Sequence, residues 1–396
     1  MTANLKLKRL LEHCVKNDFI YPKECLMDYN STAFTSFNFG PLGTILRQNI
    51  IKQWWKSVCV SQDNVFPVEN TLIDTLTMKK KRKNSQQKQI SLDTLQHYSS
   101  VYNMVQGQLP FGIATVKTDF GTDVTQKETN KVLYNSPQYA SMLLYYFVHP
   151  RNEKISFDFW KRHRIQWWKS FADNPSNFTM GQVRKEEDYT QLDILYSFPW
   201  GDDTIETLRN YNEGFQPGAK MTKTVKKKRS RKLAGVEEDP NATIATIPHM
   251  FETNAVLERA VLAYLLDACN DTNGKRISKR RKNDETLLLN LHRKLAPYTV
   301  ALSTPERPNQ HIQEVTRQLV QELRKAEISV LSTHDPRPIE EQYERYSGMG
   351  IPLCLTLHEG TLDNGLLYMR HRNTKIKEEI HVTKVCEYLL KFLAAD

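Results

Sequence analysis

The most informative segment of this 396-residue chain is Phe37-Asn38-Phe39-Gly40-Pro41-Leu42-Gly43. Its glycines and proline are typical of a tight turn. The next residues, 44–58, predict a helix with an apolar stripe, and residues 65–68 predict a strand. The stripe consists of Ile45, Ile50, Ile51, Trp54 and Trp55. After an N-terminal helical pattern, we therefore expect helices and strands to mix from the start of the chain.

The segments between residues 95 and 269 continue this mixture. Helices are predicted at 95–106 and 157–171, and a strand at 112–118. Residues 133–150 predict two paired strands, and a later strand closes at Pro199-Trp200-Gly201. A strand from residue 247 then leads into a helix, 256–268, that we expect to be buried.

The residues from 298 onward follow a separate pattern. Short apolar strands are expected at 298–302, 329–331 and 353–357, and amphipathic helices at 313–325 and 383–392. The order is strand, helix, strand, helix, strand, strand, helix, which indicates an α/β domain with a mixed sheet. We expect the chain to divide into residues 1–290 and residues 291–396.

The net charge of +10 is concentrated in three polar, loop-like stretches near residues 78–93, 219–243 and 272–285. Clustered lysine and arginine attract phosphate backbones through counterion release, without reading the base sequence. The candidate DNA-binding residues are Lys79, Lys80, Lys81, Arg82, Lys83, Lys226, Lys227, Lys228, Arg229, Arg231, Lys232, Lys279, Arg280, Arg281 and Lys282. The alternative is that these stretches are solvated surface loops, or resemble a nuclear-localisation signal.

Composition disfavours several classes of protein. The sequence has no apolar run of about 18 residues, the length that crosses a membrane. Its six cysteines form no C-x-x-C pair, which argues against a zinc site or a disulfide framework and fits a reducing compartment. Residues 1–11 are basic and lack acids, so they are either the remnant of a mitochondrial import signal or an ordinary first helix.

The predicted helix at 157–171 combines aromatic side chains with Lys161, Arg162, Arg164 and Lys169. Aromatic and basic side chains in alternation are able to stack on bases and contact phosphates. The preferred alternative is a core helix whose cations extend to solvent.

Several segments, in matching order, resemble the glycyl-type class II aminoacyl-tRNA synthetases. The segments similar to the catalytic motifs and to the elements between them are 37–43, 109–114, 158–168, 198–201 and 248–259. Those similar to the anticodon-binding domain are 295–298, 339–352 and 361–372. The resemblance covers most of the chain. It implies an α+β fold, with an antiparallel sheet and flanking helices followed by an anticodon-binding-like α/β domain with a mixed sheet.

Two motifs depart from this family where ATP would bind. The family's Phe-Arg-x-Glu is replaced by Phe120-Gly121-Thr122-Asp123, and its Gly-x-Gly-Arg by Val256-Leu257-Glu258-Arg259. Arginine holds nucleotide phosphates through paired charge-assisted hydrogen bonds, and Gly121 offers none. Val256 and Glu258 replace glycines that let the backbone approach the nucleotide, and Arg259 is expected to serve as an ion-pair partner.

The anticodon-binding domain departs from the family as well. Basic positions of the family's Ile-Gly-Arg-Arg-Tyr stretch are occupied by Glu340, Glu341 and Gln342. These side chains disfavour binding to the stem of a tRNA anticodon arm. We therefore expect a protein that is not an enzyme, with no catalytic residue, cofactor or metal.

Two regions resemble more closely the accessory subunits of the mitochondrial DNA polymerase, polymerase gamma. They are residues 157–169 with Ser176-Asn177-Phe178, and residues 198–201 followed by Ile205-Glu206-Thr207-Leu208. That resemblance implies a processivity factor of mitochondrial DNA replication, located in the matrix at the nucleoid. It would bind the catalytic subunit and strengthen that subunit's hold on primer-template DNA.

The same resemblance implies how the complex would be built. Docking is expected through the C-terminal domain, with Leu366, Leu367 and Met369 as candidates and ordinary strand core as the alternative for them. Vertebrate members carry a long helical insertion, used for homodimerisation, where this chain has only residues 74–94. A homodimer is therefore disfavoured, and a one-to-one complex with the catalytic subunit is expected.

Two other functions stay open. One is a divergent glycyl-type synthetase that still activates an amino acid. The other is a paralogue that binds tRNA or another RNA and has no polymerase partner.

Overall fold

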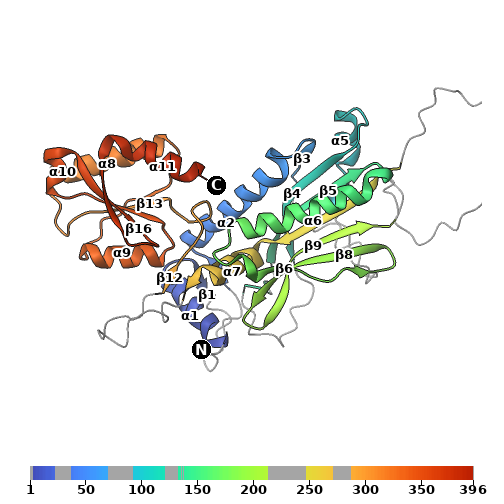
Figure 1. Ribbon diagram of the computed structural model, residues 1–396, viewed down its shortest axis with the longest axis horizontal. Helices are drawn as coiled ribbons and strands as arrows, with labels where there is room; N and C mark the ends of the chain where they lie inside the picture. The colour runs from blue at the N-terminus through green and yellow to red at the C-terminus, as the bar shows by residue number, and fades with distance from the viewer. Residues whose placement is uncertain are drawn as a thin grey trace, which may run out of the picture.

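The computed structural model describes residues 3–22, 37–69, 92–120, 133–134, 136, 138–212, 247–270 and 287–395. An eight-stranded sheet organises the first part of the chain, and a five-stranded sheet the part after residue 300 (Figure 1). Two small antiparallel pairs accompany them, β1 (Ile20–Pro22) with β2 (Phe37–Phe39) and β11 (Cys269–Asn270) with β12 (Leu288–Leu289). This α+β architecture confirms the predicted fold class.

The turn at residues 37–43 packs tightly on the backbone that follows α1 (Ala3–Lys16). The amide of Gly40 donates to the Phe19 carbonyl at 2.9 Å, and that of Leu42 to the Asp18 carbonyl at 3.1 Å. A Cβ atom on Gly43 would lie only 2.0 Å from the Phe19 oxygen. A side chain at residue 43 would therefore prevent this approach. Pro41 begins α2 (Pro41–Trp55), where a missing amide proton costs no hydrogen bond.

The eight-stranded sheet is antiparallel except at one edge, where β3 and β4 are parallel. Its order is β3 (Val65–Pro67), β4 (Phe111–Phe120), β5 (Gln138–Val148), β10 (His249–Val256), β9 (Gly201–Tyr211), β8 (Tyr189–Phe198) and β6 (Phe178–Met180), with β7 (Arg184–Lys185) also paired to β8. The two paired strands predicted within 133–150 are wrong. That region supplies the single strand β5, which pairs with the distant strands β4 and β10.

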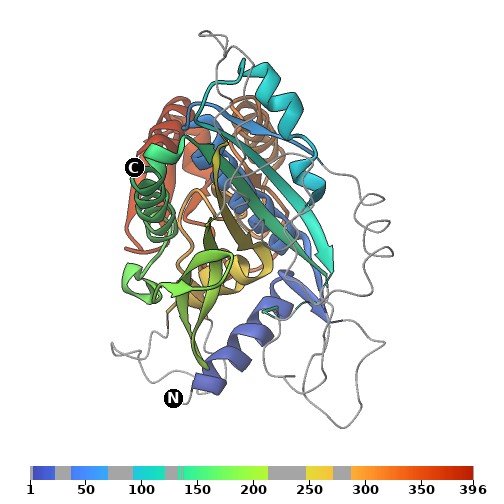
Figure 2. The same cartoon turned by 90° about the vertical axis from the view of Figure 1, so that its right-hand side faces the viewer.

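Helices cover both faces of this sheet (Figure 2). On one face, α5 (Tyr98–Met104) packs against Phe111, Tyr145 and Phe147; the helix predicted at 95–106 is divided between α4 (Leu92–Leu95) and α5. On the other face, α2, α6 (Glu153–Ser170) and α7 (Leu257–Ala268) enclose the main core, which contains Trp160 and Trp168. The helix α1 joins this core through buried leucines, as expected of an ordinary first helix.

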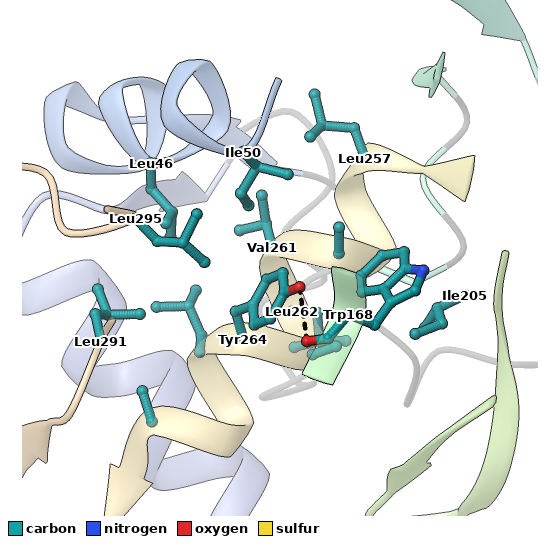
Figure 3. Packing of buried hydrophobic residues seen from close by; sticks show 14 of the residues in the cluster. Leu46, Ile50, Trp168, Ile205, Leu257, Val261, Leu262, Tyr264, Leu291 and Leu295 are labelled. Carbon is teal, nitrogen blue, oxygen red and sulfur yellow. Dashed lines mark hydrogen bonds between the residues drawn. The ribbon is translucent and has the colours of Figure 1, made fainter. Parts of the chain in front are cut away.

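Helix α7 lies at the centre of the core and is buried on nearly all sides, as predicted (Figure 3). The hydroxyl of Tyr264 donates to the carbonyl of Trp168 at 3.2 Å, which ties α7 to α6. Side chains from four other parts of the chain pack around α7: α2, α6, β9 and the segment before the second sheet. They include Leu46, Ile50, Ile205, Leu291 and Leu295.

The second sheet is mixed, as predicted. Its order is β14 (Val330–Leu331), β13 (Val300–Ser303), β15 (Leu353–Thr356), β16 (Leu366–His371) and β17 (Lys377–His381), parallel over the first three strands and antiparallel after them. Helix α9 (Ile339–Gly348) lies below it in Figure 1, and α8 (Gln310–Lys325), α10 (Glu359–Asn364) and α11 (Val385–Ala394) lie above. The short helix α10 is absent from the predicted order because its Glu-Gly-Thr-Leu-Asp-Asn sequence is typical of a turn.

Direct contacts join the two sheet-bearing parts. The ring of His13 in α1 lies 2.7 Å from the carbonyl of Gly348 in α9, and Asn49 in α2 donates to the carbonyl of Ala296 at 2.8 Å. One cluster of buried residues continues from α7 to Tyr343 and Tyr346 of α9. The division at residue 290 therefore stays a prediction.

Candidate functional site

The two segments that resemble the family's ATP motifs fall partly within the described residues. Gly121 and Asp123 lie outside them. Val256, Glu258 and Arg259 lie where β10 passes directly into α7, with Val256 as the last residue before the helix. Of the two segments, the structure therefore describes only the side chains at the junction of β10 and α7.

Glu258 is buried in the first turn of α7 and connects three elements. One carboxylate oxygen accepts a 2.8 Å hydrogen bond from Arg47 of α2, and the other accepts one of 2.8 Å from the amide of Ala140 in β5. Burial raises the pKa of the Glu258 carboxyl, and the charge of Arg47 opposes that rise. Glu258 therefore joins the start of α7 to α2 and β5 through a buried carboxylate.

Arg259 is held by a different set of groups. It donates to the carbonyl of Thr204 at 3.0 Å, and its guanidinium lies 4.1 Å from the ring centre of Tyr134. Among the described residues its partners are a carbonyl oxygen and an aromatic ring, so the expected ion pair is not found there. A stacked arginine of this kind stabilises the local structure.

The ring of Tyr134, which lies against Arg259, belongs to an aromatic group with Phe198 and Trp200. The hydroxyl of Tyr134 donates to Asp203 and, at 3.0 Å, to the Thr204 carbonyl, and Trp200 donates to Asp203 at 3.1 Å. Burial raises the pKa of Tyr134, so the hydroxyl stays protonated at neutral pH and acts as a donor. Trp200 also stacks on Phe198, with ring centres 4.8 Å apart. These contacts are structural, and they pair no general base with a nucleophile.

Among the described residues, the histidine, cysteine, aspartate and glutamate side chains form no group of three or more that could hold a metal ion. Among the helices of those residues, none is both long and apolar enough to cross a membrane.

Helix α6 uses its tryptophans for the core. Trp160 and Trp168 are almost fully buried, which removes them as stacking platforms for bases. The preferred core-helix interpretation is therefore right for the tryptophans and wrong for Arg164. This side chain has no exposed surface; it pairs with Glu206 of β9 at 2.8 Å, and Trp168 donates to the same carboxylate at 2.5 Å. Local sequence gives no signal for a partner 42 residues away.

Glu340, Glu341 and Gln342 of the anticodon-binding-like domain lie in the first turn of α9. Glu340 pairs with Lys377 of β17 at 2.9 Å. Gln342 is buried, and its amide nitrogen donates to the carbonyls of Thr304, Asp335 and Arg337 at 2.8–3.2 Å. Gln342 thus bonds α9 to the segment after β13 and to the loop before α9, and its burial keeps it from contact with a nucleic acid.

The candidate docking residues occupy β16. Leu367 and Met369 are buried in the core of the second sheet, which favours the strand-core alternative for both; their role in docking stays a prediction. Strand alternation turns these two side chains towards α8 and α11. Leu366 is half-buried at the start of the strand.

The basic runs cannot be placed in this geometry. All of their candidate DNA-binding residues lie outside the described residues. The DNA-binding role of these lysines and arginines stays a prediction.

The fold and the altered junction define a class II synthetase-like protein that carries an anticodon-binding-like domain. The family described as "Anticodon binding domain" matches residues 298–392. A glycine–tRNA ligase of Borreliella burgdorferi is 22% identical, over 89% of this chain and 91% of the relative.

Greater similarity joins the chain to a polymerase subunit. DNA polymerase subunit gamma-2 of Bos taurus is 30% identical over 90% of this chain and 79% of the relative. The mitochondrial subunit gamma-2 of Xenopus laevis is 29% identical over 90% and 82%. The chain belongs to the DNA polymerase subunit gamma-2 family.

Proposed function

We propose that this chain is a non-catalytic accessory subunit of the mitochondrial DNA polymerase. The observation that carries the proposal is the 30% identity to DNA polymerase subunit gamma-2 across 90% of the chain. The geometry of Glu258 supports it, because a buried carboxylate bonded to Arg47 and Ala140 occupies the helix start where a synthetase would admit ATP.

In this role the chain acts in mitochondria, in the matrix at the nucleoid. It binds the catalytic subunit through its C-terminal α/β part and strengthens that subunit's hold on primer-template DNA. The basic runs supply sequence-independent attraction to the duplex. With Leu367 and Met369 buried, the exposed Tyr368 and Ile376 become the better candidates for the docking surface.

Complex formation tests the partner and the stoichiometry together. Light scattering after size-exclusion chromatography should give the chain alone the mass of a monomer, and the mixture the mass of one chain plus one catalytic subunit. If the chain elutes separately from the catalytic subunit at low salt, the catalytic subunit is excluded as its partner. A complex that contains two copies of the chain would exclude the one-to-one stoichiometry but would leave the catalytic subunit as the partner.

A divergent glycyl-type synthetase is the second candidate, favoured by the similarity to glycine–tRNA ligase. Glycine-dependent exchange of pyrophosphate into ATP separates the two functions, because an accessory subunit gives none. An RNA-binding paralogue would also give no exchange, but it would not co-purify with the polymerase.

A further inference from the structure

A cavity of about 380 Å³ opens between the two sheet-bearing parts of the chain. Its lining includes residues 171–173 after α6, residues 290–293, residues 371–374 at the end of β16, and Phe392 of α11. Cavities of this size at the junction of two structural units commonly hold small molecules.

Arg372 places a buried positive charge in the lining. It is 7% exposed, and within the described part of the chain its guanidinium donates only to neutral oxygens of Gly350, Leu291, Asn290 and Asn373, at 2.6–2.9 Å. Burial lowers the pKa of Arg372 to about 10, and the charge of Asp173 opposes part of that fall. Buried charges are normally compensated by an opposite charge in contact.

Arg293 adds a second guanidinium. It donates to the carbonyl of Ala395 and lies 5.3 Å from the ring centre of Phe392. Its Nε atom is buried and has no hydrogen-bond partner among the described residues. Asp173 is the acid of the lining, and it already accepts a hydrogen bond from Asn290. The lining therefore carries more positive than negative charge.

Neutral donors and aromatic rings complete the lining. Burial, together with the nearby cations Arg293, Lys294 and Arg372, lowers the pKa of His292 to about 4, so its ring is neutral at pH 7. Its Nδ1 accepts a 3.2 Å hydrogen bond from the Lys294 amide, which leaves Nε2–H as the donor. Two half-buried phenylalanines, Phe171 and Phe392, come from opposite sides of the junction. Guanidinium groups suit a phosphate, and phenylalanine rings suit a base.

We propose that this cavity binds a nucleoside 5′-phosphate, with the phosphate at Arg293 and Arg372 and the base against the phenylalanines. The same chemistry is presented by a free nucleotide and by the 5′-phosphorylated end of a DNA strand. Because both parts of the chain line the cavity, the bound ligand bridges their junction and raises the melting temperature of the chain. The site does not depend on the polymerase partner.

Titration calorimetry on the full chain tests this site with three probes: deoxyadenosine 5′-monophosphate, deoxyadenosine and inorganic phosphate. We expect the monophosphate to bind at least about tenfold more tightly than either of its parts, since charge-assisted hydrogen bonds and stacking both contribute. Arg293→Gln should weaken that binding by about tenfold or more, and Arg293→Lys by less, because lysine keeps the charge.

Arg324→Gln is the matched control, because Arg324 is an exposed arginine of α8 that lines a separate cavity. It should bind the monophosphate as the unchanged chain does. A 5′-phosphorylated oligonucleotide that binds in the same Arg293-dependent way identifies a DNA end as the source, and one that does not bind identifies the free nucleotide.

Four results would overturn the site. They are absence of saturable monophosphate binding, equal binding of monophosphate and inorganic phosphate, unchanged binding in Arg293→Gln, or greater loss in Arg324→Gln. Melting curves of each variant show whether it is folded. If Arg293→Gln does not fold, Arg293→Lys is the deciding variant. A folded Arg293→Lys chain that shows no binding of the monophosphate would mean that Arg293 serves packing alone, and the proposal would be wrong. The assay contains no polymerase, so its failure leaves the proposed accessory role untouched.

Discussion

The carboxylate of Glu258 accepts one hydrogen bond from Arg47 and one from the Ala140 amide. Glu258→Ala leaves both donors without a partner in a buried setting and should cost about 2 kcal/mol of unfolding free energy. Glu258→Gln keeps the shape and one acceptor, so it should cost less than about 1 kcal/mol. Urea unfolding measures both, and equal stability of the Ala variant and the unchanged chain would show that the contact is dispensable.

Arg164 and Glu206 form an ion pair from which solvent is excluded. Arg164→Met should destabilise the chain by about 3–5 kcal/mol, because it leaves the Glu206 charge buried and unpaired. Adding Glu206→Gln removes that charge and should restore part of the loss. A double-mutant cycle by urea unfolding checks this, and purely additive effects would mean that the two side chains are not coupled.

Among the structural elements, α9 depends on the loop in front of it. Asp335 is buried there and pairs with Arg337 at 2.6 Å and with Arg345 at 3.0 Å. The hydrogen bond from Arg337 is the main reason that the pKa of Asp335 lies below its usual value. A lowered carboxyl pKa stabilises the fold above the unfolded-state pKa of about 4 and stops doing so as the pH falls below it.

Asp335→Asn should therefore cost about 1–2 kcal/mol at neutral pH, a value reduced by solvent screening of the partly exposed arginines. The cost should shrink towards pH 3. Urea midpoints of both chains, measured between about pH 7 and pH 3, test the sign. A cost that stays constant across this range would exclude the ion pairs as its cause.

The elements also show which features are predictable from the sequence. Helices α2, α6 and α7 were predictable because their apolar spacing is local. The single strand β5 was not, because its partners β4 and β10 are distant in the chain. Likewise, the burial of Arg164, Leu367 and Met369 depends on tertiary packing, and the contacts of Glu258 depend on Arg47, which lies 211 residues away.

At the scale of the whole molecule, one buried core runs from α1 and α2 through α7 to α9. Contacts such as that of His13 with Gly348 join the two ends of the chain. A platform of this kind presents its two sheets in a fixed relation. This supports the proposal that the chain acts as a non-catalytic accessory subunit, for which a rigid docking platform is sufficient.

The basic runs make their own prediction at this scale. Replacing the six cations among residues 226–232 with glutamine should weaken binding to duplex DNA and flatten its salt dependence. Each lost phosphate contact should reduce the slope of log affinity against log salt by about 0.9. Fluorescence anisotropy across a salt series measures this. An unchanged slope would exclude the run from DNA binding.

Primer extension by the catalytic subunit, with and without this chain and across a salt series, tests the accessory role most directly. A trap for free polymerase should be present, so that product length reports a single binding event. We expect longer products with the chain present, and a larger gain at higher salt, where the catalytic subunit alone dissociates sooner. Products of equal length at every salt concentration would contradict the accessory role.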